Sequence, residues 1–144
     1  MIIRATTNYA IQIMVAIAKS DDVISSASIS EQTGISQIYL KKIANSLKNA
    51  GLVFSQQGLR GGYSLTRAAD DITAWEILCA VGSENWDYQK QDAPPQKGES
   101  ENCSPLVRFM FEDMNELFRQ HFEAISLAEL VAMDKNDDRK SEGR

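Results

Sequence analysis

The residues whose types and spacing could do chemistry are cations and amides between positions 36 and 60. A predicted helix over 36–49 carries three lysines and no acidic residue, and a glycine-rich segment with one arginine follows at 56–62. Ammonium and guanidinium groups neutralise phosphates, while hydroxyl and amide groups reach phosphate oxygens or base edges. We therefore expect this part of the chain to bind double-stranded DNA. The candidate contacts are Ser36, Gln37, Lys41, Lys42, Lys48, Gln57 and Arg60.

The distribution of charge along the chain supports this expectation. Lysines on a helix often form no more than a solvated surface. Here residues 1–69 hold seven Lys or Arg and three Asp or Glu, a net charge of +4, whereas residues 70–144 have a net charge of −9. Such a division indicates that the first half meets a polyanion and the second half has another role.

The predicted elements would present these cations as a winged helix-turn-helix. Apolar residues at steps of three and four predict a helix over 8–19, and a capping-box spacing at 28–31 predicts a short helix ending at Gly34. Ser36 is a natural N-cap for the cationic helix. Short β-type runs at 52–55 and 63–66 flank the glycine-rich segment, which predicts a hairpin, or wing. The fold class is therefore mainly α with a small β-hairpin wing.

The second half of the chain predicts a dimerisation unit. A capping box at Thr73 begins a helix that ends near Val81, and a polar segment with prolines follows. Ser104 and Pro105 begin a long helix with two apolar stripes, which indicates burial against a second copy of the chain. Four parts follow from this pattern. They are a winged helix-turn-helix over 1–82, a sensor-type loop over 83–103, a dimerisation helix with a short closing helix over 104–133, and a flexible tail over 134–144.

Several of these segments resemble the "Rrf-two" family of bacterial regulators. The segments are residues 8–10, 34–40, 51–53 and above all 58–65, which reads GLRGGYSL. The family includes the iron–sulfur cluster regulator, the nitrite-sensitive repressor and the cysteine-metabolism repressor. The resemblance implies a homodimeric winged-helix transcription factor, usually a repressor, that binds a pseudo-palindromic operator. It also implies DNA contacts at the positions of Ser36, Tyr39, Lys41 and the wing.

The chain departs from the family pattern in the wing, in the recognition helix and in the loop. The wing commonly has two arginines, but Gln57 stands at the first of these positions, and Lys41 stands where relatives often have Glu. Cluster-binding members have three cysteines before the long helix, of which only Cys103 is matched here. Because thiolates hold such clusters, we expect no cofactor and no metal site of the family type. A cluster that bridges two subunits through both Cys103 residues is left open.

Other features of the sequence limit the classes of function that we expect for this protein. We find no paired carboxylates, catalytic triad or phosphate loop in a credible context, so we expect no enzyme. No apolar run is long enough to span a membrane, and we expect a cytoplasmic protein. Cys79 lies in an apolar pattern that is typical of core packing.

Two further hypotheses remain open. One is a winged-helix module that binds proteins without binding DNA. The other is a redox switch at Cys103, whose place before a helix N-terminus favours the thiolate. A small molecule or a partner protein could also act as effector on the loop.

Overall fold

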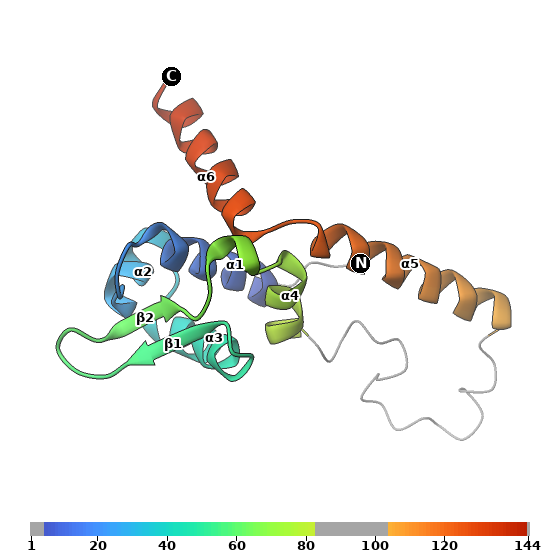
Figure 1. Cartoon of the computed structure of the whole chain (residues 1–144), viewed down its shortest axis with the longest axis horizontal. Helices are drawn as coiled ribbons and strands as arrows, with labels where there is room; N and C mark the ends of the chain where they lie inside the picture. The colour runs from blue at the N-terminus through green and yellow to red at the C-terminus, as the bar shows by residue number, and fades with distance from the viewer. Residues whose placement is uncertain (1–4, 83–103, 144) are drawn as a thin grey trace.

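The computed structural model describes residues 5–82 and 104–143 (Figure 1). Within these ranges the chain is mainly helical, with one two-stranded antiparallel sheet. The elements are α1 (Ala5–Lys19), α2 (Ser26–Thr33), α3 (Gln37–Asn49), β1 (Val53–Gln56), β2 (Gly62–Leu65), η1 (Ala69–Asp71), α4 (Ala74–Gly82), α5 (Pro105–Glu123) and α6 (Leu127–Glu142). The predicted balance of helices and one hairpin is confirmed.

The core is built around α1, which packs against α2, α3, α4 and α6. Its fully buried residues Ile13, Met14 and Ile17 recur at helical spacing. Leu40 and Leu47 of α3 are equally buried and belong to the same hydrophobic cluster. A single core therefore holds the first three helices and fixes the orientation of α3.

Backbone hydrogen bonds join the α5–α6 unit to the start of α4. An isolated antiparallel bridge pairs Thr73 with Ser126. Across it, the Ala74 N–H donates to the Ile125 carbonyl and the Leu127 N–H donates to the Ile72 carbonyl, each at 2.8 Å. Ile72 and Leu127 are completely buried there. Helices α4 and α6 thus begin next to each other, on either side of this bridge.

The sequence placed the ends of two helices wrongly. The N-cap of α2 is Ser25, whose side chain accepts a hydrogen bond from the Ser28 N–H, so α2 begins before the predicted capping box. The predicted short closing helix and tail are instead one helix, α6, which continues to Glu142.

Three contacts explain the length of α6. A capping box formed by Ser126 and Glu129 begins the helix. Asp134 and Asp138, one turn apart, both pair with Lys19 of α1. The hydrogen bond to Asp134 is the main reason that the pKa of Lys19 is raised. These contacts continue the helix beyond the apolar positions on which the sequence prediction relied.

Helix α5 extends away from the body of the molecule (Figure 1). Ser104 caps it and Pro105 occupies its first turn, as predicted. Large apolar side chains on this helix face solvent, among them Leu106 at 69%, Met110 at 62% and Leu117 at 61% exposed. None of the described helices is both long and apolar enough to cross a bilayer.

Candidate nucleic-acid interface

Helix α3 is held at both ends by local hydrogen bonds. At its start, the Ser36 hydroxyl accepts a hydrogen bond from the Tyr39 N–H at 3.4 Å. At its end, Gly51 adopts a φ of 77°. The Gly51 N–H then bonds to the Lys48 carbonyl, and the Leu52 N–H bonds to the Leu47 carbonyl. This glycine-dependent turn leads the chain directly from α3 into the first strand of the wing.

The wing is a short hairpin whose base is fixed to the helical body. Val53 pairs with Leu65 and Gln56 with Gly62. The Tyr63 N–H donates to the Ile24 carbonyl at 2.8 Å, and the Ile24 N–H donates to the Tyr63 carbonyl at 3.0 Å. A Cβ atom at Gly62 would lie only 2.1 Å from that Ile24 carbonyl oxygen. Glycine is therefore required for this close approach of two backbones.

Side chains of α2, α3 and the wing line one groove with a volume of about 530 Å³. Lys41, Asn45 and Lys48 enter it from α3, and Gln57 enters it from the wing. Ser25 and Ser26, at the start of α2, line the other side. Residues that are distant in the sequence thus form a single polar surface.

Lys41, Lys48 and Gln57 line this groove, and the remaining predicted contact residues lie outside it, on α3, its N-cap and the wing. Seven of the eight side chains are exposed, namely Ser36, Gln37, Lys41, Lys42, Lys48, Gln57 and Arg60. Tyr39 differs because its side chain is only half-exposed. Its hydroxyl lies 3.1 Å from the Thr6 hydroxyl, and its ring meets the Tyr9 ring edge-on at 5.5 Å. Tyr39 therefore positions α3 against α1.

The cations of α3 and the wing have no acidic partner among the residues that the structure describes. Among the described residues, no ion pair includes Lys41, Lys42, Lys48 or Arg60. By contrast, Lys19 pairs with α6, and Arg67 pairs with Glu76 at 2.8 Å. In the first half of the chain, as far as the structure describes it, Lys19 and Arg67 are therefore neutralised by acidic groups. The cations of α3 and the wing remain available for an anionic ligand.

Sequence reasoning missed two exposed apolar residues, Ile38 on α3 and Leu59 on the wing. Ile38, in the first turn of α3, is 87% exposed, and Leu59 at the tip of the wing is fully exposed. The helical spacing contained the signal for Ile38. This residue precedes Leu47 by roughly two and a half turns, so the two point to opposite sides of α3.

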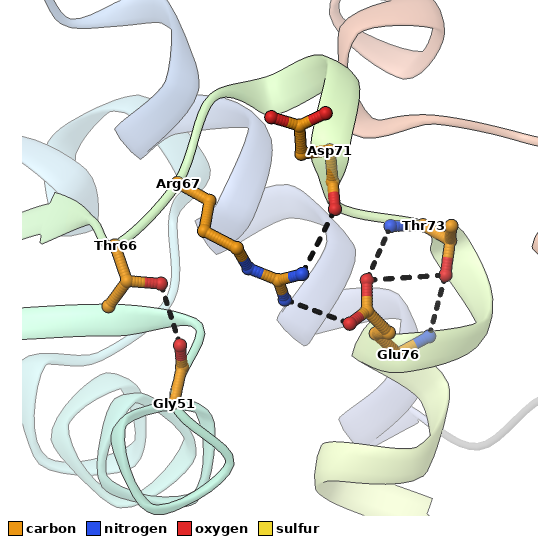
Figure 2. A network of polar contacts seen from close by, with 6 residues as sticks. All are labelled: Gly51, Thr66, Arg67, Asp71, Thr73 and Glu76. Atoms are coloured by element: carbon orange, nitrogen blue, oxygen red, sulfur yellow. Dashed lines mark hydrogen bonds and ion pairs between the residues drawn. The ribbon is translucent and has the colours of Figure 1, made fainter.

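A hydrogen bond at the root of the wing holds β2 against the end of α3 (Figure 2). The Thr66 hydroxyl donates to the Gly51 carbonyl at 2.6 Å. Because Gly51 follows α3 and Thr66 follows β2, this contact closes the loop that contains the wing. It limits how far the wing can swing from the helix.

Next to it, Arg67 and Glu76 join the wing to α4 (Figure 2). The Arg67 guanidinium donates to the Asp71 carbonyl at 3.1 Å and to the Glu76 carboxylate. That carboxylate also accepts the Thr73 N–H at 2.9 Å, and the Thr73 hydroxyl caps the helix. Burial raises the pKa of Glu76, but the Thr73 and Arg67 hydrogen bonds outweigh it, so the pKa lies below its ordinary range. The charged carboxylate is the stabilised form.

The described residues bring no metal-binding group together. Among residues 5–82 and 104–143, no cluster of three or more His, Cys, Asp or Glu could hold an ion. Burial raises the pKa of the Cys79 thiol, which favours the protonated form. Cys103 and the predicted loop over 83–103 lie outside the described residues.

Comparison with known proteins identifies the family. The sequence profile of the Rrf2 family (the Rrf-two family named above), described as an iron-dependent transcriptional regulator, matches residues 3–133. This chain belongs to the Rrf2 family. The HTH-type transcriptional regulator IscR of Erwinia tasmaniensis is 35% identical over 125 residues, which cover 85% of this chain and 74% of that protein. IscR of Yersinia enterocolitica is 33% identical over the same shares of the two chains.

Solved structures of the Rrf2 regulators show the same fold. The oxidized form of Staphylococcus aureus CymR is 26% identical and has a TM-score of 0.71, covering 91% of this chain and 96% of that chain. CymR of B. subtilis has a TM-score of 0.73 at 24% identity, covering 92% and 98%. The predicted winged-helix fold is confirmed. The chain is a DNA-binding transcriptional regulator, which decides against the hypotheses of an enzyme and of a protein-binding module without DNA.

The lowered pKa of Glu76 predicts a pH-dependent effect of its removal. Glu76→Gln should reduce the free energy of unfolding by about 1 kcal/mol at neutral pH, since it weakens a helix cap and an ion pair. The native contribution is present above the ordinary pKa of glutamate and is lost as the pH falls through the lower native value. Urea unfolding at several pH values should therefore show the difference from the unmodified protein shrinking in acid.

Glu123→Gln is the matched control. It removes the same charge from an exposed pair with Arg119 that spans one helical turn, so we expect a smaller loss than for Glu76→Gln. Equal losses for the two variants at neutral pH would contradict the role assigned to the Glu76 cluster.

Proposed function

We propose that this Rrf2 regulator is a homodimeric repressor that acts in the cytoplasm by occupying a pseudo-palindromic operator. The observation that carries the proposal is that the exposed cations of α3 and the wing, Lys41, Lys42, Lys48 and Arg60, form no ion pair among the described residues, and that these two elements contain no acidic residue. Helix α3 would enter the major groove with its N-terminal turn toward the bases. The wing, with Arg60 near its tip, would follow the adjacent backbone or minor groove.

Each exposed side chain has a role that follows from its chemistry. Lys41, Lys42 and Lys48 would neutralise phosphates, and the amides of Gln37 and Gln57 could donate and accept hydrogen bonds. The Ser36 hydroxyl already accepts the Tyr39 N–H, so its proton remains available to donate to a phosphate. The phosphate contacts would supply affinity, while contacts with base edges would supply sequence preference.

Helix α5 supports the homodimer. Its exposed apolar residues Leu106, Met110 and Leu117 share one face. An apolar face on an extended helix is suited to pairing with the same face of a second copy about a twofold axis. Two α3 helices would then reach half-sites about one DNA turn apart, ~34–36 Å, or a multiple of it.

We propose that the regulator works without a cluster held by one chain. The whole chain has two cysteines, and the pKa of Cys79 is raised by burial. Iron–sulfur clusters need several thiolate ligands, which this donor set does not provide within one subunit. The redox role of Cys103 and the identity of a small-molecule or protein effector remain predictions from the sequence.

The salt dependence of DNA binding tests the assigned phosphate contacts. A duplex enriched from random sequence serves as the ligand, and failure to enrich any duplex would contradict the proposed function. Lys41→Gln, Lys42→Gln, Lys48→Gln and Arg60→Gln should each weaken binding. Each should also reduce the slope of log affinity against log salt by about 0.9 for one lost phosphate contact. Fluorescence anisotropy between about 50 and 200 mM salt measures both quantities.

Lys140→Gln is the control for these variants because it removes the same charge from the last turn of α6. We expect it to leave the slope unchanged. A reduction equal to that of Lys41→Gln would mean that net charge, rather than this surface, governs binding.

A substitution in the exposed apolar face of α5 tests whether the protein dimerises through this helix. Met110→Asp places a charge in the exposed apolar face and should shift the protein from dimer to monomer in sedimentation experiments. It should weaken operator binding as well, because the two half-sites are no longer bound together. Arg108→Gln makes the same change in net charge at an exposed position on the opposite side of α5, two residues before Met110, and should leave the dimer intact. A Met110→Asp protein that remains fully dimeric would contradict this interface.

A further inference from the structure

Ile38 occupies the centre of the outward face of α3. One and two turns further along, Lys41, Lys42 and Asn45 share this face, since they follow at intervals of three, four and seven residues. All four side chains are exposed, and that of Ile38 is 87% exposed. The buried stripe of Leu40, Ile43, Ala44 and Leu47 lies on the other side of the helix.

A single exposed apolar residue is ordinary on a protein surface, but the position of Ile38 is not. It lies in the first turn of the recognition helix, where side chains of helix-turn-helix proteins reach base edges. Its neighbours on this face are an acid-free set of polar and cationic groups. Any duplex that contacts Lys41 and Lys42 through its phosphates would therefore also cover Ile38.

The major groove offers one apolar group to such a side chain, the C5-methyl of thymine. We infer that Ile38 recognises a thymine methyl group in each half-site of the operator. This inference rests on the proposed function and names the base type that one position of α3 selects. Uracil presents the same hydrogen-bonding edge without the methyl group, so the preference would be for the methyl itself.

The side chain of Ile38 is suited to this contact. A β-branched residue in a helix has one strongly preferred χ1 rotamer, so its methyl groups are already oriented before DNA binds. Gln37 is its neighbour in the same turn and is also exposed, and a Gln amide can pair with an adenine edge. The two residues together would favour an A·T-containing step under the first turn of α3.

Replacing thymine by deoxyuridine tests the contact with one methyl group at a time. Starting from the enriched duplex, each thymine of one half-site is replaced in turn, and dissociation constants are measured by anisotropy. For the unmodified protein, one replacement should weaken binding about fourfold, the effect of exposing one methyl group. Replacement in both half-sites should weaken it about sixteenfold.

Protein variants then assign the effect to Ile38. Ile38→Ala should bind the thymine and deoxyuridine duplexes equally well, because the side chain that meets the methyl group is gone. Alanine favours the helix, so the variant should fold. Leu59→Ala is the matched control, since it shortens the exposed apolar residue of the wing and should keep the fourfold difference.

Two results would overturn the inference. One is an unmodified protein that binds the enriched duplex but shows no sensitivity at any thymine. The other is an Ile38→Ala variant that discriminates as strongly as the unmodified protein. Both presuppose an enriched duplex, whereas failure of the proposed function would appear earlier, as the absence of any duplex that binds.

Discussion

The arrangement of this regulator depends on the short backbone bridge between Thr73 and Ser126. Helices α4 and α6 begin at this point, each with a side-chain cap completed by a glutamate three residues later. The carbonyl of Ile125 and the N–H of Leu127 are thereby satisfied in a buried place, where unpaired backbone groups would be costly. Ser126 follows α5 and Thr73 precedes α4, so this bridge fixes the end of α5 relative to the domain that carries α3 and the wing. A dimer built on α5 would consequently fix the separation of its two recognition helices.

The second feature on which this arrangement depends is that some cations form ion pairs and others do not. Lys19 and Arg67 bind acidic groups from α6 and α4 and so contribute to the architecture. The cations of α3 and the wing tip have no such partners among the described residues. Unpaired exposed cations repel one another, and a phosphate backbone relieves that repulsion. The two groups of cations are thus distinguished by whether they form ion pairs. The net charge of the whole protein, −5, does not distinguish them.

The sequence predicted the architecture well because its signals were local. Ser36, Gly51 and the Thr73 capping box each determine a helix end through contacts within a few residues. The true length of α6 could not be predicted in this way, because Asp134 is held by Lys19, 115 positions away in the sequence. The half-buried state of Tyr39 likewise depends on tertiary contacts with α1. The contacts of Tyr39 with Thr6 and Tyr9 therefore could not be predicted from the spacing of residues within α3.

The most direct measurement of the central claim is the reactivity of each lysine toward an acetylating reagent, with and without the enriched duplex, read by mass spectrometry. The account predicts that DNA slows the modification of Lys41, Lys42 and Lys48 and leaves Lys135 and Lys140 of α6 unchanged. Undiminished reactivity of the three α3 lysines, or protection confined to α6, would contradict it.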